Sequence, residues 1–289
     1  MTINDKIDDY ITFPKTFENY RWYKPILVFI LTLVIMFILG ALVFGVFYLM
    51  AGFEFMQTIF KGGYEAFNSP LALLFTDLLI IIFIPALYLA SKVIKDRPFS
   101  SYSSSRGGWN FKLYFKALII PVILYIIYLA ADTAIKGPKG TSNISIAFLI
   151  VLLISIPLQS IAEEYIFRGL IMQTLGSWFN MPVLVLVLQA IIFTFGHGYN
   201  TIGLFETLVT GLGYGFFAWK TNGLEISSAL HTANNFSLGL FVMLGLQATT
   251  SSPQLWDVAA TIVFLIILFA VMYYVGEKTD WFGEIPENS

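Results

Sequence analysis

The stretch ISIAFLIVLLISIPLQSIAEEYIFRGLIMQTL, residues 144–175, decides the fold class of this chain. Its apolar run is longer than the roughly 20 residues that a helix needs to cross a bilayer. Glu163, Glu164 and Arg168 nevertheless lie within it. Because a charged side chain at membrane depth is costly, it asks for a partner or a function. The stretch therefore predicts a membrane-spanning segment that carries a polar site.

Seven further apolar segments flank this one along the chain. They cover approximately residues 25–50, 71–91, 113–131, 182–197, 204–219, 224–244 and 258–275. Runs of this length differ from the alternating segments of about ten residues that build an outer-membrane barrel. We therefore expect an all-α polytopic membrane protein with about eight transmembrane helices and an intramembrane polar site.

The composition supports a membrane protein and excludes several other classes. Of the 289 residues, 57% are hydrophobic and 12% charged, whereas about a quarter of a soluble domain is charged. This excludes a soluble enzyme, a disordered chain and a basic nucleic-acid binder, so no nucleic-acid partner is expected. Since the chain has no cysteine, it has no disulfide, thiol nucleophile or thiolate metal site.

The distribution of basic residues predicts the orientation of the chain. Most of the 16 Lys and Arg residues fall on one predicted side of the membrane. They lie before the first span, between Lys92 and Lys116, and after later spans as Lys220 and Lys278. The opposite side has Lys61, Lys136 and Lys139. By the positive-inside rule, both termini are cytoplasmic in a cell membrane that the chain crosses several times.

One transmembrane domain is expected over residues 1–289. Its motif-bearing core covers about residues 144–244, between a polar N-terminus at 1–24 and a C-terminal tail at 277–289. The N-terminus lacks the pattern of a cleavable signal peptide, and the first apolar run is expected to stay as an anchor. The loop at 92–112 is rich in serine and is expected to be flexible.

The paired acids at the end of the deciding stretch differ in their helical neighbours. Glu164 and Arg168 are four residues apart with the acid first, the favourable order for an ion pair. Glu163 is rotated from Glu164 by about 100° and has no local cation. One carboxylate can therefore be structural while the other remains free for proton transfer. The alternative is a buried ionic network that holds helices together.

Both histidines of the chain lie in the same region. His197 ends the segment at 182–197, and His231 is followed by Asn235 four residues later. At 1.5 Å per residue, Glu163 and His197 lie about 20 Å and 22 Å from the turns between their spans, and His231 about 12 Å from its own. Glu163 and His197 are thus expected at similar depth, and helix tilt could bring His231 level with them, although each group alone could be a structural hydrogen-bonding group.

A carboxylate, two imidazoles and an amide in one cavity suit the hydrolysis of a peptide bond. Glu163 with His197 could activate a water, and His231 with Asn235 could stabilise the oxyanion. No nucleophilic serine elbow or His-Glu-x-x-His zinc motif is present. A zinc site of two His and two Glu remains possible on residue types alone.

These residues resemble a known signature. Glu163-Glu164-x-x-x-Arg168, Phe193-x-x-x-His197 and His231-x-x-x-Asn235 look like the three motifs of the CPBP intramembrane proteases, which include the type II CAAX prenyl endopeptidases and bacterial bacteriocin-related proteins. The first three spans are not diagnostic, and the loops look more like those of bacterial members.

The resemblance implies a glutamate-dependent and metal-independent endopeptidase with no cofactor. Glu163 and His197 would activate water, and His231 and Asn235 would form the oxyanion hole. Glu164 and Arg168 would be supporting groups. The expected partners are the lipid bilayer and a protein or peptide substrate at the membrane, whose prenylation is not implied. The oligomeric state stays open.

Two other function classes remain open. The chain could be a non-enzymatic immunity or regulatory protein that retains the protease fold, or a proton-coupled transporter that uses the same groups as a relay. The transporter is disfavoured because its usual repeat symmetry is missing and the intramembrane ionisable groups gather in one region. Asp77 and Glu206 are expected to line a cavity or stabilise a kink. Gly211-x-Gly213-x-Gly215 is expected to allow close helix packing.

Overall fold

The computed structural model describes residues 9–62 and 69–279, and these residues are helical for most of their length. Its helices are η2 (Phe13–Thr16), α1 (Lys24–Gly62), α2 (Pro70–Ile81), α3 (Phe83–Ile94), α4 (Ser100–Ser103), α5 (Phe111–Lys136), α6 (Ile146–Glu164), η4 (Tyr165–Met172), α7 (Gln173–Phe179), α8 (Pro182–Phe195), α9 (Thr201–Lys220), α10 (Glu225–Met243) and α11 (Leu255–Lys278). Within these ranges no β-strand occurs, and Ser104 and Gly223 form an isolated bridge. The predictions for residues 1–8 and 280–289 lie outside the described part.

Six helical segments of the described part are long and apolar enough to cross a membrane. They are Lys24–Lys61, Pro70–Ile94, Phe111–Lys136, Ile146–Phe179, Thr201–Lys220 and Leu255–Lys278. The two other expected segments are also helical, but α8 has 14 residues and α10 carries many polar side chains. The polytopic all-α class is confirmed, and the number of eight spanning helices stays a prediction.

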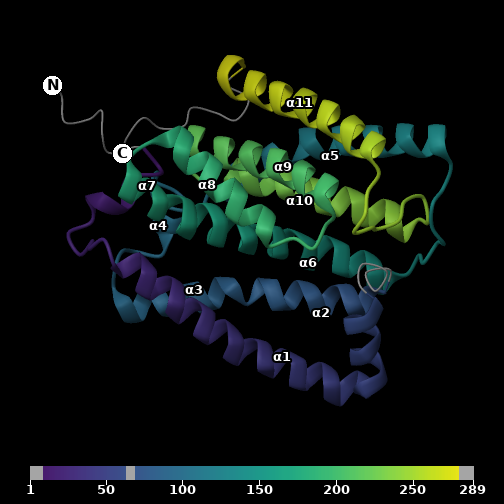
Figure 1. The fold of residues 1–289 in the computed structure, drawn as a ribbon, viewed down its shortest axis with the longest axis horizontal. Helices are drawn as coiled ribbons and strands as arrows, with labels where there is room; N and C mark the ends of the chain where they lie inside the picture. The colour runs from purple at the N-terminus through teal and green to yellow at the C-terminus, as the bar shows by residue number, and fades with distance from the viewer. Residues whose placement is uncertain (1–8, 63–68, 280–289) are drawn as a thin grey trace.

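Two of the long segments are interrupted where the backbone requires it. In α1 the helix breaks at Gly52, whose φ of 80° is open to glycine without steric cost. Figure 1 shows α1 turning sharply before it reaches the grey segment. Helices α2 and α3 are separated at Ile82, because Pro85 has no N–H to donate to the carbonyl of Ile81.

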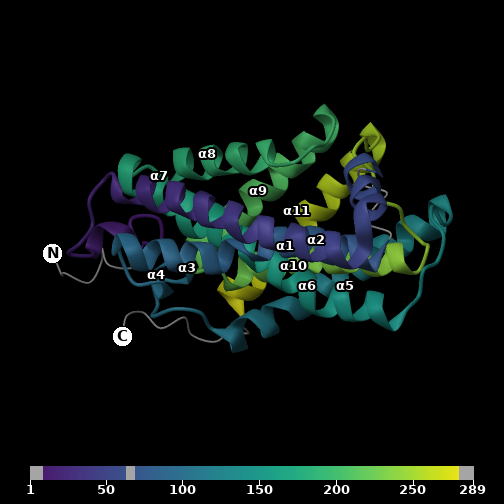
Figure 2. The ribbon, with the colours of Figure 1, turned by 90° about the horizontal axis from the view of Figure 1, so that it is seen from below.

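Helix α10 lies at the centre of the molecule. It packs against α5, α6 and α9, and α8 packs on the far side of α9. Helix α1 packs on α3, and α2 packs on α6. In Figure 1, α10 accordingly lies between α9 and α6, while α1 and α11 occupy the outer edges, and Figure 2 shows α8 along the upper edge and α5 along the lower edge. This arrangement places α10 against α6 and α9, and α8 against α9 and η4.

The glycine series on α9 allows close approach of neighbouring helices. A Cβ atom at Gly211 would lie 3.1 Å from a ring carbon of Phe193, and one at Gly215 would overlap the amide of Gln189. A Cβ at Gly213 would overlap the ring of Phe269 on α11. The expectation that these glycines serve helix packing is confirmed.

The expectation of a flexible loop at 92–112 is wrong, because the loop is packed into the protein. Tyr102 is fully buried and donates a hydrogen bond to Oδ2 of Asp96 at 2.6 Å. Arg106 forms a 2.9 Å ion pair with Glu225 at the start of α10. Serine is common in flexible loops, but here Ser101 and other serines are small enough to be buried between helices.

Candidate active site

The two adjacent glutamates lie where α6 passes into the π-helix η4. Glu164 is the last residue of α6, and Arg168 lies within η4. Their side chains are both fully buried, and Nη1 of Arg168 lies 2.9 Å from Oε1 of Glu164. The ion pair expected from their spacing is present. Single π turns inside α-helices are frequent at functional sites, where they change the direction of side chains.

Arg168 is held by more than its ion pair. Its Nη2 donates to the backbone carbonyl of Gly211 at 3.2 Å, and its guanidinium lies 4.4 Å from the ring centroid of Phe193. Gln189 donates to the same carbonyl at 2.9 Å. The buried cation therefore joins η4 to α8 and α9, which is the role of a structural support.

His231 of α10 lies between the two glutamates. Its Nδ1 is 2.9 Å from Oε1 of Glu164, and its Nε2 is 3.6 Å from Oε2 of Glu163. Because the carboxylate of Glu164, paired with Arg168, can only accept a hydrogen bond, Nδ1 of His231 is the donor and carries a proton. The imidazole is thus fixed in orientation, with Nε2 directed to the side of Glu163.

The environments of the two carboxylates differ, as the sequence suggested. The Glu163 side chain is 14% exposed, against 0% for Glu164. Oε1 of Glu163 accepts a 2.7 Å hydrogen bond from Nε2 of Gln159, one turn earlier on α6. Glu163 therefore keeps access to a cavity, while its neighbour is enclosed in the ion pair.

A directional chain of side-chain amides leads from α10 to Glu163. Asn234 donates to Oδ1 of Asn235 at 2.9 Å, and Asn235 donates to Oε1 of Gln159 at 3.0 Å. Gln159 in turn donates to Glu163. Because the Asn235 amide has two N–H groups, one remains for a further acceptor. These hydrogen bonds fix the orientation of the Asn235 and Gln159 side-chain amides.

His197 follows the end of α8 and is positioned through Phe193. Its Nδ1 lies 2.9 Å from the carbonyl oxygen of Phe193, so Nδ1 is the protonated nitrogen and Nε2 bears the lone pair. The buried ring of Phe193 contacts the rings of His197 and His231, with centroid distances of 4.6 Å and 6.0 Å. The i, i+4 spacing of the motif is explained by this contact.

One cavity of about 420 Å³ joins these groups. Glu163, His197, His231 and Asn235 all line it, together with Gln159. Glu164 and Arg168 do not line it, because they are buried behind His231. The structure therefore brings together the four residues expected to act on a substrate and separates them from the two expected to support.

Two further carboxylic acids, Asp77 and Glu206, line the same cavity. Oγ of Ser155 donates to Asp77 at 2.5 Å between α6 and α2. Among the described residues, no group of three His, Asp or Glu side chains is arranged to hold a metal ion.

Sequence reasoning missed three residues of the site. Gln159 connects Glu163 to Asn235, Gln189 shares the Gly211 carbonyl with Arg168, and the Tyr214 ring lies 5.2 Å from that of His231. The signal that could have found Gln159 is its position four residues before Glu163 inside an apolar run.

Comparison with known proteins agrees with this geometry. Residues 145–237 match the family model described as type II CAAX prenyl endopeptidase Rce1-like. The chain is also 27% identical over 237 residues to the uncharacterized protein YyaK of Bacillus subtilis (strain 168), a match that covers 73% of this chain and 78% of YyaK. No solved structure matches the chain significantly.

The matched segment starts at the first turn of α6 and ends within α10, so it contains all six expected site residues. The match shows that residues 145–237 are similar to a family of intramembrane proteases. The multi-pass helical architecture agrees with it. The resemblance to the CPBP intramembrane proteases is therefore confirmed for residues 145–237, the segment that carries the whole candidate site.

Proposed function

We propose that the protein is a glutamate-dependent intramembrane endopeptidase that hydrolyses a peptide bond of a membrane-associated protein or peptide. The observation that carries the proposal is the unequal pair of adjacent acids. Glu163 reaches the cavity, and Glu164 is enclosed with Arg168. Two carboxylates in different environments can take different roles, one in proton transfer and one in support.

In the proposed reaction a water lies between Glu163 and Nε2 of His197. As the water oxygen attacks the carbonyl carbon of the peptide, its proton passes to Glu163. The tetrahedral intermediate then collapses, the C–N bond breaks, and the proton held by Glu163 goes to the leaving nitrogen. One water thus converts the peptide bond into an amine and a carboxylic acid, without a covalent enzyme intermediate.

The oxyanion would be held by donors on α10. The second N–H of Asn235 is available for it, and Nε2 of His231 donates when the imidazole carries two protons. Glu164 and Arg168 keep the imidazole in place. Prepositioned donors of this kind need little reorganisation when charge develops on the oxygen.

We further propose that the reaction needs no metal ion and that the chain lies in the cell membrane with both termini in the cytoplasm. The support for the orientation is the excess of Lys and Arg on one side. The support for the metal-free reaction is that no three His, Asp or Glu side chains among the described residues are arranged to hold a metal ion.

The test compares membrane-protein fragments in cells that express the wild type, Glu163→Gln or Glu206→Gln. Glu206 is the matched control, since it lines the same cavity outside the amide chain. We expect new N-termini in the wild type and in Glu206→Gln, and their loss in Glu163→Gln. Cleavage by purified protein should persist after exhaustive chelation. Persistent cleavage by Glu163→Gln would contradict the glutamate mechanism.

A further inference from the structure

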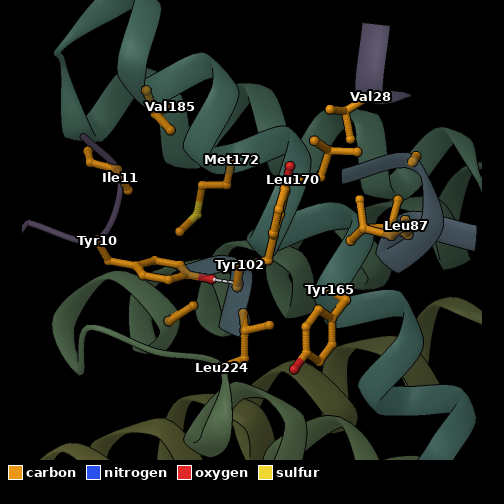
Figure 3. Packing of buried hydrophobic residues seen from close by; sticks show 13 residues of the cluster. Tyr10, Ile11, Val28, Leu87, Tyr102, Tyr165, Leu170, Met172, Val185 and Leu224 are labelled. Carbon is orange, nitrogen blue, oxygen red and sulfur yellow. Dashed lines mark hydrogen bonds between the residues drawn. The ribbon is translucent and has the colours of Figure 1, made fainter. Parts of the chain in front are cut away.

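The end of the molecule near the N-terminal segment is closed by a tightly packed core. Tyr10 and Ile11 are fully buried there, and the Tyr10 hydroxyl donates to the backbone carbonyl of Tyr102 at 2.5 Å. Leu170, Met172 and Leu224 are also at most 1% exposed. Figure 3 shows the Tyr10 ring among Met172, Tyr102 and Leu224, so residues distant in sequence converge at this end.

The loop before α5 seals the same end against the turn before α10. Leu224 donates its backbone N–H to the carbonyl of Ser103 at 2.8 Å. The ion pair of Arg106 and Glu225 lies beside it. A cavity at this end is lined by Phe17, Ser91, Asp96 and neighbouring residues, and none of the four proposed catalytic residues lines it.

The cavity of the candidate site extends to the opposite end of the helices. It is lined by residues of α9 between Gly203 and Tyr214 and by residues of α10 between His231 and Val242. It also reaches the segment between α10 and α11, where Ala248 and Thr250 line it and are exposed. The route from the site to the surface therefore runs away from the closed end.

The closed end is the one that carries most of the positive charge of the chain. Lys24, Lys95, Arg97 and Lys220 all lie at that end of their helices. The opposite end contains three basic residues, which are Lys61 near the end of α1, Lys136 at the end of α5 and Lys139 after it. By the positive-inside rule the closed end faces the cytoplasm.

From these two asymmetries we propose that the active site takes its substrate from the non-cytoplasmic side of the membrane. The substrate class is a polypeptide segment presented at the outer surface, which enters the outer half of the helix bundle to reach Glu163. A segment confined to the cytoplasm meets the packed core of Tyr10 and Tyr102 instead. This inference rests on the proposed protease function and adds the side of access.

The absence of native cysteine allows a direct test with single-cysteine variants. Thr210→Cys reports on the cavity, because Thr210 lines it and its hydroxyl bonds to the carbonyl of Glu206 within the same helix. Ser252→Cys marks the outer surface, and Asn19→Cys marks the closed end. Both marker positions are exposed.

Right-side-out and inside-out membrane vesicles are treated with a small, membrane-impermeant trimethylammonium methanethiosulfonate. The modified fraction is measured by the loss of later maleimide labelling in denaturant. A cationic reagent suits a cavity that Asp77, Glu163 and Glu206 line. We expect Ser252→Cys and Thr210→Cys to react in right-side-out vesicles, and Asn19→Cys to react in inside-out vesicles.

Reaction of Thr210→Cys from the cytoplasmic side, from both sides or from neither would overturn the proposal. The proposal would also be overturned if Ser252→Cys reacted only in inside-out vesicles and Asn19→Cys only in right-side-out vesicles, because the orientation would then be inverted. The labelling needs no catalysis, so the same pattern is expected when Glu163→Gln is added. Loss of proteolysis and loss of outer access are therefore separate results.

Discussion

Nδ1 of His231 lies 2.9 Å from Oε1 of Glu164, across 67 positions of sequence and between α10 and the end of α6. The same carboxylate oxygen accepts from Arg168 at 2.9 Å. Glu164 thus holds a cation and an imidazole at once, inside a fully buried site. We propose that Glu164 fixes His231 in front of Glu163, so that the orientation of the site depends on a residue that does not line the cavity.

Glu164→Gln is expected to destabilise the protein strongly. The change leaves the charge of Arg168 buried without its counter-ion, which costs about 3–5 kcal/mol. The free energy of unfolding in detergent, measured by denaturant titration, checks this. Glu163→Gln is the matched control, because Gln159 can still donate to the new amide and the loss should be about 1 kcal/mol or less. Equal losses in the two variants would show that Glu164 is no more structural than Glu163.

The long helices were predictable because the bilayer sets the length of an apolar run. The predicted segment at 113–131 lies within α5 and that at 204–219 within α9. The effect of proline was less predictable. Pro85 separates α2 from α3, whereas Pro121 and Pro157 lie inside continuous helices. Neighbouring helices decide whether a proline breaks a helix or is accommodated.

The site was predictable where it depends on local spacing. The pair of Glu164 and Arg168 follows from i, i+4 geometry. The contact of His231 with Glu164 depends on how α10 crosses α6, which rise per residue along separate helices does not determine. The role of Gln159 depends on the same crossing. The packed loop at 92–112 was missed because composition does not distinguish exposed serine from buried serine such as Ser101.

Gln159→Leu is expected to lower kcat by up to about 100-fold with little change in KM, because it releases both Glu163 and Asn235 from their fixed orientations. Gln159 acts as a positioning residue, since both of its amide atoms bond to other site residues. Kinetics of the single variants and of the double variant with Asn235→Ala check this. The fold loss of kcat in the double variant should be smaller than the product of the fold losses in the two single variants.

Ser160→Ala is the control for this variant, because Ser160 donates to Gln159 at the longer distance of 3.3 Å. Its kcat should stay within a few-fold of the wild type. Independent, fully multiplicative effects of Gln159→Leu and Asn235→Ala would contradict the amide chain.

Asn235→Ala is expected to reduce kcat by about 100- to 1000-fold, the usual loss when one oxyanion donor is removed. Asn234→Ala is the matched control on the same helix. Asn234 also lines the cavity and orients the Asn235 amide without reaching the oxyanion, so its loss should lower kcat much less than the loss of Asn235. Single-turnover rates of the two variants check the difference. Similar losses in both would assign the effect to the packing of α10 and not to the oxyanion.

Gly215→Ala is expected to destabilise the protein and to lower activity from a distance. The added methyl group would overlap the Gln189 amide, and overpacking of this kind costs about 1–3 kcal/mol. Since Gln189 and Arg168 share the carbonyl of Gly211, the displacement reaches the support of Glu164. Gly45→Ala is the control, because no atom lies within 4 Å of a Cβ there and alanine favours the helix by up to about 1 kcal/mol. Unfolding free energy and kcat of both variants check this. A Gly215→Ala protein as stable and active as Gly45→Ala would show that α8 and α9 can separate without disturbing Arg168.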